Sequence, residues 1–233
     1  MESLITPSGA PSSRRDFFKR AGAGVSVLGA AAVLQACDSE DNTPASNLEL
    51  DFSNDVGVLN YAYALEQLEA AFYKTVITAA NFATLFPAAE QAVLRDIAAH
   101  EAVHDDFFKT AITAAAPSQI IPRLTATFPA AALASRASIL ATALTFEDLG
   151  VSAYNGAGKY ISSDTYLTLA GKIVSVEARH ASIIAGLITP NAVAGAGQID
   201  ANALDVSKAP RTVLAAAQQY ITETITVKPG TGL

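Results

Sequence analysis

Two short stretches of sequence decide the fold of this chain: Glu101-Ala102-Val103-His104 and Glu177-Ala178-Arg179-His180. In each stretch a glutamate and a histidine are three residues apart. On a helix both side chains then project from one face and can bind one metal ion. A single motif of this kind is commonplace, but the chain has only 3 histidines and two of them fall in the motif. The pair therefore predicts two helices that share a metal site.

A further glutamate precedes each motif in an otherwise apolar stretch, and a tyrosine follows that glutamate by seven residues. The two pairs are Glu66 with Tyr73 and Glu147 with Tyr154. The order glutamate, tyrosine, Glu-x-x-His therefore occurs twice in the chain, which indicates an internal repeat of two helical hairpins. A two-fold arrangement of the hairpins would bring the four carboxylates and both imidazoles to the centre of a bundle.

The expected cofactor follows from the charge of this cluster. Four carboxylates buried without a cation would repel one another and lose their hydration. Two divalent metal ions offset that charge, and oxygen ligands with two imidazoles suit iron or manganese better than copper or structural zinc. We therefore expect two metal ions, iron ahead of manganese. The alternatives are a site that has lost its metal and a buried polar network that serves structure alone.

The spacing of apolar residues predicts four long helices, over residues 55–80, 87–116, 129–161 and 164–188. Ser162 and Ser163 offer an N-cap to the fourth helix. Residues 118–129 contain two prolines and are long enough to cross from one end of a bundle to the other. Residues 210–224 suggest a short further helix, and no strand pattern is convincing. The fold class is all-α: a four-helix bundle with a long crossover between helices 2 and 3 and a short C-terminal helix.

This set of motifs resembles the ferritin-like di-iron carboxylate superfamily, in which two helices give one glutamate each and two give Glu-x-x-His. The opening helix, LNYAYALEQLEAAFY at residues 59–73, is similar to that of the exported ferritin-like domain family, whose members include proteins described as desiccation-related. The resemblance covers residues 55–188 and implies a ferritin-like four-helix bundle. Its motifs are specific for fold and site and weak for activity.

The resemblance also implies a role for each site residue. The resemblance implies that Glu66 and Glu147 are terminal carboxylate ligands and that Glu101 and Glu177 bridge the two metal ions. His104 and His180 would bind one metal ion each. Tyr73 and Tyr154 would each reach the terminal glutamate of the other hairpin, and we assign them as the catalytic residues. Glu69 shares a helical stripe with Glu66 and is the alternative ligand; the tyrosine spacing favours Glu66. His100 points about 100° away from Glu101 on a helix, which favours a place beside the ligands or on the surface.

The N-terminus predicts an export signal. Ser13-Arg14-Arg15-Asp16-Phe17-Phe18-Lys19 is followed by a short apolar run up to Ala36, the pattern of a signal peptide. The arginine segment resembles a twin-arginine signal. Val33-Leu34-Gln35-Ala36-Cys37 resembles a bacterial lipobox, whose cysteine is acylated. The alternative is that Cys37 is an ordinary small residue near a conventional cleavage site.

These features predict four segments: a twin-arginine and lipoprotein signal over 1–37, a flexible linker over 38–54, the bundle over 55–224 and a tail over 225–233. We expect export by the twin-arginine pathway and a periplasmic or envelope lipoprotein anchored at Cys37. The only expected membrane contact is that lipid anchor.

Composition excludes several classes of protein. A formal net charge of −7 argues against a nucleic-acid partner. The single cysteine excludes an internal disulfide, a Cys-ligated zinc and a rubredoxin-type iron site. The single methionine is Met1, which excludes a haem held by two methionines.

The leading functional hypothesis is redox chemistry at a non-haem di-iron or di-manganese centre. Such an oxidoreductase would be of the ferroxidase or peroxide-removing type, and its partner would be a small-molecule oxidant or Fe(II). Two alternatives remain, a metal-binding module without turnover and a structural stress or desiccation-related protein of the envelope. A homodimer is also possible.

Overall fold

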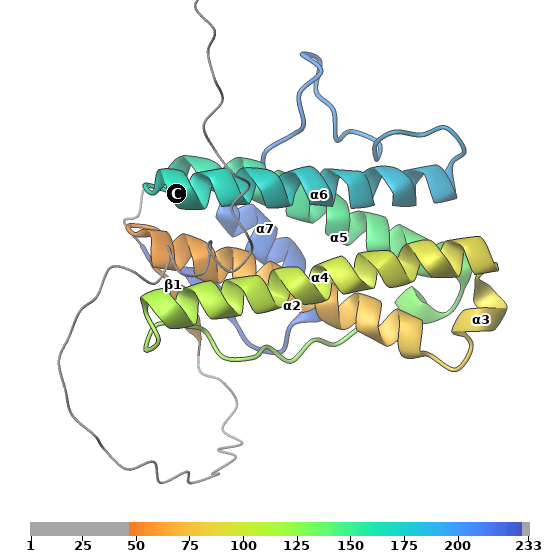
Figure 1. Cartoon of the computed structure of the whole chain (residues 1–233), viewed down its shortest axis with the longest axis horizontal. Helices are drawn as coiled ribbons and strands as arrows, with labels where there is room; N and C mark the ends of the chain where they lie inside the picture. The colour runs from red at the N-terminus through yellow and green to blue at the C-terminus, as the bar shows by residue number, and fades with distance from the viewer. Residues whose placement is uncertain (1–46, 230–233) are drawn as a thin grey trace, which may run out of the picture. The chain divides into compact units, whose positions relative to one another are not determined.

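A computed structural model describes residues 47–229. Among these residues, four long helices form the bulk of the fold: α2 (Asp55–Thr78), α4 (Ala88–Ala115), α5 (Arg136–Ala157) and α6 (Asp164–Ile188). The α2 helix packs along α4, and α5 packs along α6, so that two hairpins lie side by side (Figure 1). The predicted all-α bundle is confirmed.

Short elements complete the described part of the chain. They are β1 (Leu48–Leu50), α3 (Phe82–Leu85), η1 (Ala130–Leu133), η2 (Gly158–Tyr160), α7 (Pro210–Ala217), η3 (Gln218–Tyr220) and β2 (Ile225–Val227). Within residues 47–229, none of the helices combines the length and the apolar character needed to cross a membrane.

Local capping explains where the helices begin. Ser163 precedes α6 and its side chain accepts a hydrogen bond from the backbone N–H of Tyr166, as the sequence predicts. The predicted start of the third helix near Pro129 is wrong by several residues. Residues 130–133 form one 3-10 turn, and Ser135 then starts α5 through reciprocal hydrogen bonds with Ser138, an arrangement that satisfies the free N–H groups of the first turn.

The two ends of the described chain also differ from the prediction. The sequence predicts a flexible linker at Leu48–Leu50 and a tail at Ile225–Val227, yet the two segments pair as parallel strands. Leu50 and Val227 are 2% and 3% exposed and belong to the core. Burial of alternate apolar side chains fixes these segments. The predicted signal peptide with Cys37, the first part of the linker and the last residues of the tail lie outside the described residues.

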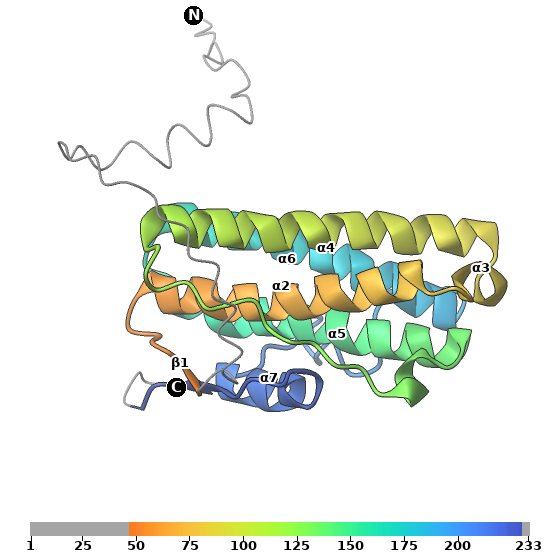
Figure 2. The ribbon, with the colours of Figure 1, turned by 90° about the horizontal axis from the view of Figure 1, so that it is seen from below.

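The crossover between α4 and α5 runs beside α2 for much of the length of the bundle (Figure 2). Two buried amides of α2 hold it in place. Asn60 accepts a hydrogen bond from the Ile121 N–H at 2.9 Å, and Gln67 accepts one from the Leu124 N–H at 2.7 Å. Seven residues separate the two amides, so they repeat on one face of α2 and bind the extended chain twice.

Candidate metal centre

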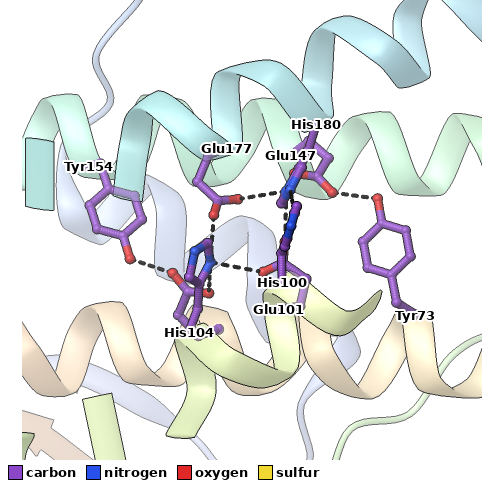
Figure 3. A network of polar contacts seen from close by, with 9 residues as sticks. Tyr73, His100, Glu101, His104, Glu147, Tyr154, Glu177 and His180 are labelled. Carbon is purple, nitrogen blue, oxygen red and sulfur yellow. Dashed lines mark hydrogen bonds and ion pairs between the residues drawn. The ribbon is translucent and has the colours of Figure 1, made fainter. Parts of the chain in front are cut away.

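The six predicted ligands lie together between the four long helices. Helices α2 and α5 contribute one glutamate each, and α4 and α6 contribute one glutamate and one histidine each: Glu66, Glu147, Glu101, His104, Glu177 and His180. The four glutamates are at most 1% exposed, and His180 is 4% exposed. Figure 3 shows the imidazoles among the carboxylates, with Tyr154 and Tyr73 at opposite ends of the cluster.

The first ligand group surrounds His104. Its Nδ1 atom lies 2.9 Å from Glu177 Oε1, 3.3 Å from Glu66 Oε2 and 3.6 Å from Glu101 Oε2. The ligand atoms of this group all lie within 4.8 Å of one another, so that one cation could contact all of them.

The second group surrounds His180. Its Nδ1 atom lies 2.8 Å from Glu101 Oε1, 3.4 Å from Glu147 Oε2 and 3.9 Å from Glu177 Oε2. Glu101 and Glu177 therefore give one oxygen to each group, as bridging carboxylates would. Glu66 and Glu147 each belong to one group, and Glu69 belongs to neither.

Unsatisfied polar atoms provide a test of whether metal ions fit. Among the described residues, nine buried side-chain oxygen or nitrogen atoms lack a hydrogen bond, and all except the Tyr61 hydroxyl belong to the six clustered residues. The histidine nitrogens come close to the carboxylates but do not meet them in hydrogen-bonding geometry. Buried polar atoms are normally satisfied, so a convergence of lone pairs on two points is the arrangement that two cations require. The residues fit a metal pair, although their assignment as ligands stays a prediction.

The remaining oxygens of the two outer glutamates are held by the tyrosines. The Tyr73 hydroxyl donates to Glu147 Oε1, and the Tyr154 hydroxyl donates to Glu66 Oε1. Each tyrosine thus reaches the glutamate of the other hairpin, as the resemblance implied. These contacts orient each carboxylate so that its second oxygen faces the cluster. The catalytic role of the tyrosines remains a prediction.

Comparison with known families agrees with this geometry. The model of the ferritin-like domain matches residues 54–190, which include all four long helices and all six clustered residues. The chain belongs to the ferritin-like domain family. No curated protein matches it. The ferritin-like assignment covers the fold and a carboxylate and histidine site able to hold metal ions.

Electrostatics show how this ferritin-like site balances its charge with protons. Burial opposes protonation of His104, but the surrounding carboxylates outweigh it and raise the pKa of His104 to about 12. The same balance raises the pKa of His180 to about 10. Burial also raises the pKa of Glu66 to about 7. Without a metal the site therefore holds protons where cations would bind, and metal binding must release them.

The bridging carboxylates differ in their pKa. For Glu101, burial favours the neutral form, but contacts with His104 and His180 outweigh it and lower the pKa to about 2. For Glu177, burial and the charges of Glu101 and Glu66 raise the pKa well above its usual value. The pKa values of the two bridging carboxylates are therefore shifted in opposite directions, although each gives an oxygen to both groups.

Two further side chains, His100 and Glu69, lie beside the six clustered residues. His100 Nδ1 lies 2.9 Å from His180 Nε2, and the two rings stack. This contact fixes the orientation of His180 while His100 itself is exposed, which agrees with the prediction that His100 lies beside the ligands or on the surface. Glu69 is buried, and burial with the charge of Glu177 raises its pKa well above the usual value. The i, i+4 spacing of His100 and His104 places both imidazoles on one face of α4. This spacing was the signal in the sequence that could have indicated the contact between His100 and His180.

Proposed function

We propose that this chain binds two iron or manganese ions and uses them for redox chemistry with oxygen, peroxide or Fe(II). The observation that carries the proposal is the set of buried carboxylate and imidazole atoms that converge without hydrogen bonds. Carboxylates stabilise the higher oxidation states of such metals, and bound iron or manganese would supply the electron transfer.

The protein residues would hold and shield this centre. Glu101 and Glu177 would bridge the ions, because each has one oxygen in either group. Burial raises the pKa of Tyr73 and of Tyr154 well above the usual value. Both hydroxyls therefore stay protonated and continue to donate to Glu147 and Glu66. The apolar core around the cluster limits access by water and strengthens these electrostatic contacts.

Rapid mixing tests the redox proposal. The full chain is loaded with Fe(II) without oxygen, mixed with oxygen or with peroxide, and followed by absorbance. We expect Fe(II) oxidation faster than that of free Fe(II) with at least one oxidant, and its loss in Glu101→Ala/His104→Ala. The matched control is Asp106→Ala, which removes an exposed carboxylate of the same helix. Metal binding without acceleration by either oxidant would contradict the redox proposal and favour a metal-binding module.

We also propose that the protein is exported by the twin-arginine pathway and anchored through Cys37. The support is the arginine pair, the apolar run and the cysteine at its end. Cell fractionation of Cys37→Ala tests the anchor. The variant should move from the membrane fraction to the soluble fraction, whereas Arg14→Lys/Arg15→Lys should remain in the cytoplasm. Membrane association that persists without Cys37 would contradict lipid anchoring.

A further inference from the structure

A pocket lies on the outer side of α5, and we call it the outer pocket. Four residues of α5 form its floor, at helical spacings of three and four: Ala141, Leu144, Thr145 and Asp148. None of the six clustered residues lines it, because Asp148 projects about 100° away from Glu147 on the helix. Its volume of about 480 Å³ lies within the range of small-molecule sites.

The walls of the outer pocket come from the C-terminal part of the chain. One wall is the loop over residues 189–209, which follows α6, and the other is α7 with η3. Figure 2 shows α7 beside α5. The family match ends at residue 190, so both walls lie almost entirely outside it. The outer pocket is therefore a feature of this chain that the family assignment does not cover.

Backbone contacts hold the loop against α5. The Lys208 N–H donates to the Ser152 carbonyl at 3.0 Å, and a Cβ atom at Gly156 would lie 1.8 Å from the Lys208 carbonyl oxygen. A Cβ atom at Gly195 would lie 2.1 Å from Asp148 Oδ2. The loop thus approaches α5 at two places where only glycine fits. These contacts form the outer pocket before any ligand binds, as is usual for small-molecule sites.

The outer pocket is lined by one carboxylate and one ammonium group that do not pair. Asp148 on the floor and Lys208 on the loop are both part-exposed, so a ligand can reach them. Their charges interact, yet within residues 47–229 neither side chain makes an ion pair or a hydrogen bond. Arg123 and Asp105, by contrast, meet through two hydrogen bonds. Opposite charges held apart beside one pocket suit a ligand that carries both.

The remaining lining defines the ligand further. Leu144, Phe146 and Ile188 supply apolar surface, which favours an apolar side chain on the ligand. Asp205 adds a second negative charge near Asp148, so the surroundings favour an ammonium group at that end. Hydrogen bonds between charged partners are stronger than neutral ones and fix orientation.

We propose that the outer pocket binds a zwitterion of the amino-acid type with an apolar side chain, its ammonium group on Asp148 and its carboxylate on Lys208. The outer pocket shares no residue with the metal cluster, so the proposal stands independently of the redox function.

Three probes of one shape test the ligand class: leucine, isocaproate, which lacks the ammonium group, and isoamylamine, which lacks the carboxylate. Each is titrated into the full chain while protein resonances are followed by NMR. Leucine should bind about tenfold more tightly than either analogue, the value of one charged hydrogen bond. Asp148→Asn should remove its advantage over isocaproate, and Lys208→Met its advantage over isoamylamine.

A filled variant tests the location. Ala141→Phe places a large side chain on the exposed floor of the outer pocket and should abolish leucine binding. Ala137→Phe, one turn earlier on α5, adds the same bulk at an exposed position outside the lining and should leave binding unchanged. Failure of the wild type to bind leucine, or equal binding by Ala141→Phe, would overturn the proposal. Binding of either analogue as tightly as leucine would overturn the assignment of a zwitterion.

Discussion

The two ends of the metal cluster have equivalent ligands but different surroundings. We call the part with Tyr73, Glu147 and His180 the closed end. The part with Tyr154, Glu66 and His104 is the open end. At the closed end Tyr73 is 0% exposed, and Phe72 and Leu94 fill the space beside it. At the open end Tyr154 is only part-buried and borders an apolar cavity between the four long helices, which Ala157 and Ala170 also line.

The two halves of the repeat have the same kinds of ligand, but the side chains packed around those ligands differ. Each end has one terminal glutamate, one histidine and one tyrosine from the other hairpin. Only the closed end has a second imidazole, because the position equivalent to His100 on α6 is Val176. Identical ligands beside different neighbours predict two metal positions that bind the same ions but respond differently to changes around them.

The largest expected effect tests the difference in packing. Leu94→Ala at the closed end removes a side chain that is 0% exposed and should lower the free energy of unfolding by about 4 kcal/mol. Leu65→Ala, beside the existing cavity, should cost nearer about 2 kcal/mol, because the side chain makes fewer contacts to lose. Urea denaturation of both variants measures the difference. Equal losses would show that the two ends are equally well packed.

The next effect tests the shared chemistry. His104 and His180 have raised pKa values, about 12 and about 10, so protons compete with metal and affinity falls as the pH is lowered. Because metal binding must release one imidazole proton at each end, the metal affinity of each site falls about tenfold for each unit by which the pH is lowered. Competition titrations between pH 8 and pH 6 should give the steeper slope for the open-end site, because Glu66, whose pKa is about 7, also gains a proton there as the pH falls. Affinity that does not change over this range would contradict an imidazole at either site.

Removal of each tyrosine hydroxyl should have an intermediate effect. Tyr73→Phe leaves Glu147 Oε1 buried without its donor and should lower stability by about 2 kcal/mol. Tyr154→Phe should cost less, because Tyr154 is only part-buried, whereas Tyr73 is 0% exposed. Thermal unfolding of both metal-free variants compares them. A larger loss for Tyr154→Phe would contradict the assignment of open and closed ends.

The smallest effect concerns the second imidazole. His100→Ala removes the contact to His180 Nε2 and should weaken one of the two metal sites about tenfold, as loss of a ligand's hydrogen-bond partner does. Val176→Ala, at the equivalent position, is the control and should leave both sites unchanged. Stepwise metal titration distinguishes the sites. Equal weakening of both sites by His100→Ala would contradict its placement at the closed end.

Local patterns predicted much of this structure. The i, i+3 and i, i+7 spacings located the six clustered residues and both tyrosines, because helical geometry alone puts such side chains on one face. Ser163 located the start of α6 for the same local reason. The start of α5 was predicted too early because a proline at 129 and a following run of alanines read as a helix start, whereas Ser135 provides the actual cap.

Contacts between distant segments could not be predicted from the sequence. The strands β1 and β2 are three residues each and come from opposite ends of the described chain, too short for a pattern and too far apart for a local signal. The cavity was also hidden, because alanines such as Ala157 and Ala170 favour helix wherever they lie. Their effect on packing appears only when the other half of the repeat is placed opposite them.

The central claim is that the cluster holds two metal ions, and elemental analysis of the full chain tests it most directly. The chain is purified without chelators, together with Glu101→Ala/His104→Ala and the Asp106→Ala control. The account predicts about two iron or manganese ions per chain in the wild type and the control, and their loss in the double variant. Little metal in the wild type, even after incubation with Fe(II) or Mn(II) without oxygen, would contradict it.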